Sequence, residues 1–370
     1  MLKRRWLVLA GPPFILILAV AVIANLGQPV AKAVGVIALP RLGHCPSTAA
    51  VAVGTAQLGT WWKTQDHLDS SGALVGRELF VGHDAGSTAH LDLPVESSVS
   101  GPVDGLVVLS LDDGSRSQIQ LVSVAGRCGV LVHGDANVVR GAILDPRDGA
   151  IFAHLVDRGS RADLGTFRVP PAGTGAAELR LVVPPLPLEL QQATGLVFGT
   201  TLKLDRQATH LAVQSCSDGP CITRIVDLAV PDARPVVLRD RQQGPLIGFA
   251  GNSLVTWAAC GGLPCSILAW DLGTGRARAL ASGQAAALTP DGRRLVVTYD
   301  NGAGAGASEI DTATGRSTGL RALPEGRFPV PGAAAAVVGL EVAADEVAMT
   351  SLAGDPFPFR PDAAAVEPLP

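Results

Sequence analysis

Short apolar segments separated by turn-forming residues recur along this chain, and the clearest set lies in residues 285–320. Its first two segments are separated by Thr289-Pro290-Asp291-Gly292, where proline presets φ and glycine accepts left-handed geometry, so a tight turn is predicted. Thr312-Ala313-Thr314-Gly315 predicts a second turn. The predicted antiparallel strands are Ala285–Leu288, Arg294–Tyr299, Ala307–Asp311 and Arg316–Leu320.

The same pattern occurs upstream of this stretch. Segment 270–276 (WDLGTGR) aligns with segment 310–316 (IDTATGR), and Asp227, Asp271 and Asp311 are spaced by 44 and 40 residues. Four short strands repeated at this period predict an all-β fold, a β-propeller of about seven four-stranded blades, with six blades as the alternative.

The polar residues of these repeats are expected to have structural roles. Aspartate side chains accept hydrogen bonds from turn N–H groups, and glycines take a positive φ. The residues expected to form the turns are Pro290, Asp291, Gly292, Asp271, Gly275, Asp311 and Gly315.

The turn motifs resemble those of the TolB-type propellers and other extracytoplasmic WD-like repeat proteins. In that family Ser-Pro-Asp-Gly precedes an apolar strand, and Asp-x-x-Thr-Gly-Arg follows the third strand. Residues 289–292 and 311–316 match these motifs, and Asp145-Pro146-Arg147-Asp148-Gly149 matches the first with one insertion. The resemblance covers residues 140–320 and implies the fold only, because propellers host many unrelated functions.

The N-terminus has the pattern of a membrane segment. Lys3-Arg4-Arg5 precedes Trp6–Leu26, whose 21 residues carry no formal charge and are long enough to span a bilayer as a helix. The basic flank favours a cytoplasmic N-terminus, which places the rest of the chain outside. A signal peptide cleaved after Ala33 is the alternative, because Ala31-Lys32-Ala33 fits a cleavage site and would yield a secreted protein. The expected parts are a cytoplasmic flank at 1–5, an anchor or signal peptide at 6–26, a linker at 27–48 and the propeller at 49–370.

The six cysteines are consistent with export. Cys216 and Cys221, like Cys260 and Cys265, are separated by four residues with proline before the second cysteine. Apolar segments flank each pair, so each is predicted to form a disulfide at the base of a hairpin. One zinc ion bound by the four thiolates, or free thiols, are the alternatives. Cys45 and Cys128 remain as a third, long-range bridge.

Composition and motifs argue against several classes of function. The net charge is −4 and the arginines are scattered, so the chain lacks the basic footprint that nucleic-acid binding requires. No α/β-hydrolase pattern follows the repeats, so it is not expected to be the propeller of a prolyl-peptidase-type enzyme, and it contains no His-Glu-x-x-His. No catalytic, metal or cofactor residue is assigned. An axial metal site built from histidines is the alternative to structural roles for His44, His67, His83, His90, His133, His154 and His210.

These patterns lead to two functional hypotheses. The favoured one is a non-catalytic extracytoplasmic propeller with a single membrane anchor, which binds a protein or a cell-envelope ligand. The alternative is a propeller enzyme, a lactonase-like hydrolase or a quinone-dependent dehydrogenase, with a metal or cofactor on the central axis. Trp61-Trp62 is expected to fill a groove between blades, with an exposed ligand-stacking pair as the alternative.

Overall fold

Most apolar segments of the second half of the chain become strands close to their predicted positions. The computed structural model divides the chain into two compact units, Met1–Ile37 and Ala38–Pro370, and the described residues all belong to the second. They are residues 43–44, 60–71, 73–83, 87–94, 97–103, 106–123, 128–171, 179–187, 191, 199–216, 221–238, 243–258, 265–283, 285–289, 291–300, 305–322, 337–343, 346–351 and 357–359.

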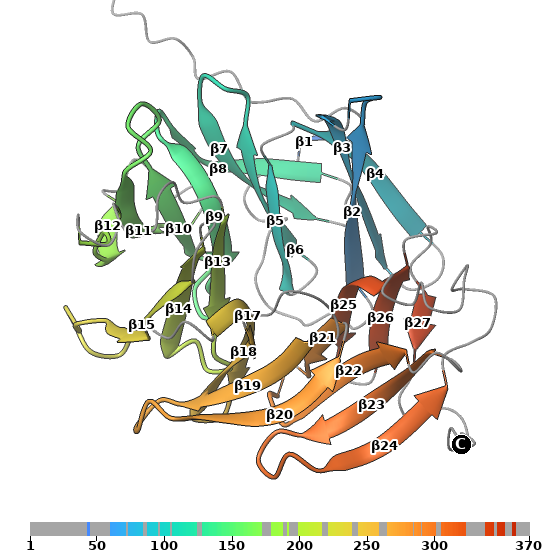
Figure 1. Ribbon diagram of the computed structural model, residues 1–370. Coiled ribbons are helices and arrows are strands. Elements are labelled where there is room, and N and C mark those ends of the chain that lie inside the picture. The colour runs from blue at the N-terminus through green and yellow to red at the C-terminus, as the bar shows by residue number, and fades with distance from the viewer. Residues whose placement is uncertain are drawn as a thin grey trace, which may run out of the picture. The chain divides into compact units, whose positions relative to one another are not determined.

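The described strands form seven sheets, which we number in chain order. The first sheet has three strands and the second has five (Figure 1). The first consists of β2 (Thr60–Leu68), β3 (Leu74–His83) and β4 (Ser87–Leu93). The second consists of β5 (Ser98–Val103), β6 (Leu106–Asp112), β7 (Ser117–Ser123), β8 (Cys128–Asp135) and β1 (Gly43–His44).

The next two sheets have four antiparallel strands each, paired in chain order. The third consists of β9 (Val138–Leu144), β10 (Ile151–Val156), β11 (Asp163–Val169) and β12 (Arg180–Val183). The fourth consists of β13 (Gly199–Leu204), β14 (His210–Cys216), β15 (Ile222–Asp227) and β16 (Val236–Leu238).

The remaining sheets follow the same order. The fifth consists of β17 (Gln243–Ala250), β18 (Ser253–Ala258), β19 (Cys265–Asp271) and β20 (Ala277–Gly283). The sixth consists of β21 (Ala285–Leu288), β22 (Arg294–Asp300), β23 (Ala305–Asp311) and β24 (Ser317–Ala322). The seventh consists of β25 (Val337–Ala343), β26 (Glu346–Ser351) and β27 (Phe357–Phe359).

Successive sheets contact each other through their first strands. β2 contacts β5, β5 contacts β9, and the series continues through β13, β17 and β21 to β25. Figure 1 shows these sheets side by side, each running outward from its first strand. Meandering four-stranded sheets joined in this way are the blades of a β-propeller, so the predicted all-β propeller fold is confirmed.

Burial is greatest in the second strands of the sheets and least in the outermost strands. Every residue of β6 and β10 is buried, whereas β12 and β16 each begin with exposed residues. Apolar clusters fill the spaces between neighbouring sheets, and Phe152 of the third sheet packs with Leu211 and Val213 of the fourth. Burying a Phe side chain contributes about 1.5–3 kcal/mol, so each sheet is stabilised chiefly by its neighbours.

The predicted turns have the expected local geometry. Gly275, Gly292 and Gly315 have φ of 67°, 68° and 72°. The carboxylates of Asp271 and Asp311 each accept hydrogen bonds from the backbone N–H and the hydroxyl of a threonine three residues later. A Cβ at Gly292 would lie 2.7 Å from the carbonyl oxygen of Phe249, so this glycine also permits close contact with the fifth sheet.

Of the predicted N-terminal segments, the structure describes only residues 43–44, near the end of the linker. β1 lies within the predicted linker and pairs parallel to β8, with Gly43 opposite Cys128, so the second sheet has one strand more than expected. Among the described residues, no helix has the length and apolarity needed to traverse a lipid bilayer. The predicted anchor at 6–26 lies outside them.

The structure contains the disulfide between Cys216 and Cys221, whose Cα atoms are 4.2 Å apart. Cys128 and Cys265 are also disulfide-bonded, whereas Cys45 and Cys260, their predicted partners, lie outside the described residues. The pairings of Cys260 with Cys265 and of Cys45 with Cys128 therefore stay predictions.

Candidate ligand groove between the third and fourth sheets

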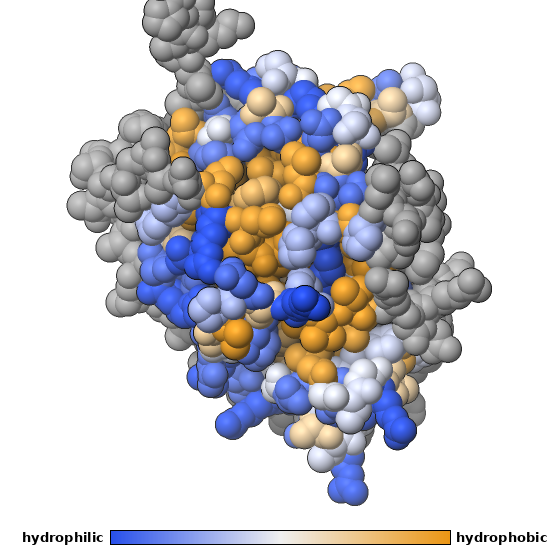
Figure 2. Space-filling model, turned by 90° about the vertical axis from the view of Figure 1, so that its left-hand side faces the viewer, coloured by the Kyte–Doolittle hydropathy of each residue, from blue (hydrophilic) through white to orange (hydrophobic). Residues whose placement is uncertain are grey.

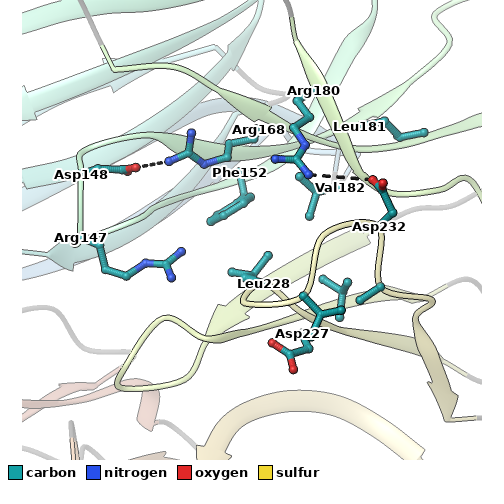
Figure 3. Close-up of a pocket in the computed structure, with 13 residues that line it drawn as sticks. Arg147, Asp148, Phe152, Arg168, Arg180, Leu181, Val182, Asp227, Leu228 and Asp232 are labelled. Carbon is teal, nitrogen blue, oxygen red and sulfur yellow. Dashed lines mark hydrogen bonds and ion pairs between the residues drawn. The ribbon is translucent and has the colours of Figure 1, made fainter.

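A groove of about 440 Å³ lies between the third and fourth sheets. Its apolar floor includes Phe152, Val182, Val226 and Leu228. Figure 2 views the molecule from the left-hand side of Figure 1, and orange apolar side chains there lie between blue hydrophilic ones. The close-up in Figure 3 shows that charged side chains from both sheets surround the floor.

The groove owes one wall to an enlarged turn. Eight residues separate Asp227 from β16, whereas five separate Asp271 from β20 and Asp311 from β24. The three additional residues place Val230 and Asp232 at the groove, with Val230 52% exposed. Asp232 has φ of 56°, a left-handed conformation that aspartate tolerates better than most residues. This wall is therefore a departure from the repeat.

The opposite wall carries three arginines, all from the third sheet. Arg147 follows β9 and donates from Nε and Nη2 to the two oxygens of Asp145, at 3.0 and 2.7 Å. The Asp145 side chain is fully buried and the Arg147 side chain is 43% exposed. The hydrogen bond to Asp145 raises the pKa of Arg147 above its usual value, so this guanidinium is always charged.

The other two arginines are held less firmly. Arg168 of β11 pairs with Asp148, and Arg180 of β12 approaches Asp232 at 3.9 Å, as the dashed lines in Figure 3 mark. The Arg180 and Asp232 side chains are 65% and 95% exposed, so solvent screens their attraction. A guanidinium has five N–H donors, so Arg168 and Arg180 keep donors that a ligand can use.

A second group of charged residues joins the same two sheets at a fully buried position. We call His154, Asp163 and Arg224 the buried cluster. Nη2 of Arg224, in β15, lies 3.0 Å from Oδ2 of Asp163, and Nη1 donates to the carbonyl oxygen of Pro184 at 2.6 Å. Asp163 also accepts the backbone N–H groups of Gly165 and Leu186.

His154 completes the buried cluster. Its Nδ1 lies 3.0 Å from Oγ1 of Thr166, and its Nε2 lies 3.4 Å from Oδ1 of Asp163 without forming a hydrogen bond. Burial lowers the pKa of His154 to about 4, and the nearby Arg224 charge acts in the same direction, while Asp163 opposes them. The imidazole is therefore neutral at physiological pH.

The histidines considered for an axial metal site are dispersed. His154 belongs to the buried cluster, while His210 contacts Asp205 at 3.1 Å and His133 contacts Asp135 at 3.0 Å. Among the described residues, no group of three or more His, Cys, Asp or Glu side chains is arranged to hold a metal ion. Trp61 and Trp62 lie in β2, and their side chains lie outside the described part of the structure.

The groove was not predicted from the sequence, in which Asp145–Gly149 indicated a structural turn and Asp227 a repeat position. One signal was present, because the segment after Asp227 lacks the Thr-Gly-Arg ending found after Asp271 and Asp311 and is three residues longer. The arginines of the opposite wall had no such signal, since they precede this turn by 47 to 80 residues.

Comparison with known proteins supports the fold and identifies no family. Neither a protein-family description nor a curated protein matches the chain. One similar solved structure comes from a study of two prolyl endopeptidases, with a TM-score of 0.52, 12% identity, and coverage of 85% of this chain and 48% of that one. The structure of puromycin hydrolase has a TM-score of 0.51 and 15% identity, with coverage of 80% of this chain and 50% of that one.

Two further structures belong to the same comparison. A puromycin-hydrolyzing peptidase from Mycobacterium tuberculosis gives a TM-score of 0.50 at 14% identity, with coverage of 88% of this chain and 57% of that one. TolB from Acinetobacter baumannii has a TM-score of 0.43 at 13% identity, with coverage of 79% of this chain and 77% of that one. This chain thus spans about half the length of the three peptidases. The likeness to the structures with TM-scores of 0.50 or more supports the β-propeller fold, and at this identity the fold is all that it shows.

Proposed function

We propose that this protein is a non-catalytic binding module, a seven-bladed propeller held on the outer side of the cytoplasmic membrane by its N-terminal segment. Its ligand is a protein, with a cell-envelope component as the alternative. The proposal of seven blades is supported by the seven sheets of the described residues.

The groove carries this proposal. Its described lining consists of apolar residues, arginines and aspartates, without His, Cys, Ser, Thr, Tyr or Lys. Arginine stays protonated in proteins, so it positions and attracts ligands but does not exchange protons. Concave apolar surfaces with a few convergent polar groups are typical of binding sites. The apolar floor and the charged walls therefore support recognition of a ligand.

The cellular location rests on sequence and on disulfide chemistry. The basic, then apolar, N-terminus is typical of an inner-membrane segment with the following domain outside. The Cys216–Cys221 disulfide supports the same location, since disulfides persist in oxidising compartments.

The first experiment tests topology and binding in cells. A reporter that is active only in the cytoplasm, fused after Pro370, is expected to be inactive. A photoreactive residue at Val230, beside the groove, is expected to cross-link to one defined protein. The matched control is Val75 in the first sheet, which is 59% exposed and remote from the groove, and it is expected to give no such product.

Other outcomes contradict this function. Strong cytoplasmic reporter activity would exclude the proposed location. Equal cross-linking from residues 230 and 75, or none from residue 230, would exclude binding at the groove. A stoichiometric metal or a quinone absorbance in the purified protein would favour the enzyme hypothesis.

A further inference from the structure

We propose that the groove binds an extended protein segment in which an acidic and a basic residue are neighbours and are flanked by aliphatic residues. This inference rests on the proposed function and specifies the chemistry of its ligand. The observation behind it is the separation of charge across the groove.

The two walls have opposite charge. Arg147, Arg168 and Arg180 all come from the third sheet. In the fourth sheet, Asp227 ends β15 and Asp232 lies in the enlarged turn that follows it. The carboxylates beside the arginines, Asp145 and Asp148, are already paired with Arg147 and Arg168. The pair that spans the groove, Arg180 with Asp232, is long and exposed, so a ligand can replace it with little loss.

Both walls keep unused hydrogen-bonding capacity. Arg180 can present a guanidinium fork to a carboxylate, which it would bind through two charge-assisted hydrogen bonds. Asp232, 95% exposed, can accept from an ammonium or guanidinium group. A ligand with a single sign of charge would satisfy one wall and be repelled by the other.

An extended chain has the geometry that such walls require. Successive side chains of a strand point to opposite sides, so neighbouring acidic and basic residues would reach opposite walls. Leu181 and Val230 are 46% and 52% exposed beside the charged groups, where they would contact the flanking aliphatic side chains. The groove volume suits a few side chains rather than a folded domain.

The acidic wall disfavours polyanions. Nucleic acids and acidic polysaccharides would place negative groups against Asp227 and Asp232. A zwitterionic phosphatidylethanolamine headgroup shares the required charge pair. Its aliphatic chains lie on one side of the charge pair only, whereas a peptide can place aliphatic side chains on both sides. The exposed Leu181 and Val230 therefore favour a peptide.

The test measures binding of fluorescein-labelled hexapeptides to the purified full-length chain in detergent by fluorescence anisotropy. The peptide Gly-Val-Asp-Lys-Val-Gly is expected to bind. Peptides with Asp-Asp or Lys-Lys at the centre are expected to bind about tenfold or more weakly, because each loses one charge-assisted interaction. Absence of measurable binding of the Asp-Lys peptide at about 1 mM would overturn the proposal.

Variants of the spanning pair provide the decisive comparison. Arg180→Glu and Asp232→Lys are each expected to weaken binding of the Asp-Lys peptide about tenfold or more, and the double variant is expected to restore it, because the charge pair is then only reversed. Arg276→Glu, in the exposed turn of the fifth sheet, is the matched control and should change nothing. Circular dichroism and thermal unfolding verify that each variant is folded.

The outcomes separate this inference from the function on which it rests. Equal binding of all three peptides, or single variants that bind like the wild type, would overturn the inference while cross-linking from residue 230 still supports the function. Phosphatidylethanolamine vesicles that displace the peptide at lower concentration than unlabelled peptide would replace the peptide with a lipid headgroup as ligand. Absence of cross-linking from residue 230 would remove the function itself.

Discussion

The buried cluster and the groove connect the same two sheets with arginine–aspartate pairs, and they differ in accessibility. In the buried cluster the Arg224 and Asp163 side chains are 3% and 0% exposed, and backbone groups bind Nη1 of Arg224 and both oxygens of Asp163. In the groove, Arg180 and Asp232 are mostly exposed and 3.9 Å apart. The same residue types thus stabilise the sheet interface at one site and leave capacity for a ligand at the other.

The difference follows from desolvation. A charge that has lost its hydration must keep its protein partners, because an uncompensated buried charge is costly. An exposed pair contributes little to stability, since water replaces either partner easily. Pairs of the second kind are therefore the ones that can be exchanged for a ligand.

The largest expected effect contrasts the two arginines. Arg224→Ala leaves Asp163 buried without its counter-ion and is expected to lower the free energy of unfolding by about 3–5 kcal/mol. Arg180→Ala should change it by less than about 0.5 kcal/mol. Urea unfolding of the full-length chain in detergent measures both values. Equal losses for the two variants would show that the groove pair is also structural.

The second prediction concerns pH. The folded-state pKa of His154 is about 4, below its ordinary 6.5, so the unfolded chain binds a proton in this range that the folded chain does not. Stability is therefore complete above pH 6.5 and falls as the pH decreases toward 4, by up to about 3 kcal/mol. His154→Gln should remove this dependence. Parallel stability profiles for the two proteins, measured by thermal unfolding, would contradict the assignment.

Arg147 is intermediate between the two kinds of pair, with an exposed guanidinium on a buried carboxylate. Arg147→Ala is expected to cost about 1–2 kcal/mol, less than Arg224→Ala because solvent can reach the site. The midpoint of urea unfolding gives this value, with Arg276→Ala as the control. A loss as large as that of Arg224→Ala would place Arg147 with the buried cluster.

The last prediction restores the repeat in the enlarged turn and is expected to change stability little. Residues 228–235 can be replaced with Leu-Gly-Thr-Gly-Arg, the segment found at 272–276. Because the replaced turn is largely exposed, the free energy of unfolding should change by less than about 1 kcal/mol. Binding of the Asp-Lys peptide should be weakened, since Asp232 is gone. Unchanged peptide binding would show that Asp232 has no role.

The repeat made much of the fold predictable. The four strands predicted in residues 285–320 agree with β21–β24 within two residues at each end. Local physics suffices there, because proline and glycine set the turns and short apolar segments between them set the strands. The Cys216–Cys221 disulfide was predictable for the same reason, since its partners are separated by a short hairpin.

The chain by itself determined the period of the repeat, the turn residues at Gly275, Gly292 and Gly315, and the alternation of apolar segments that places the strands. Only the tertiary structure decided that the arginines of the third sheet face the aspartates of the fourth, and that Arg224 is buried while Arg180 is exposed. The physical reason is that turns and strands depend on neighbours in sequence. The environment of a charge depends on how two sheets pack, which joins residues many positions apart.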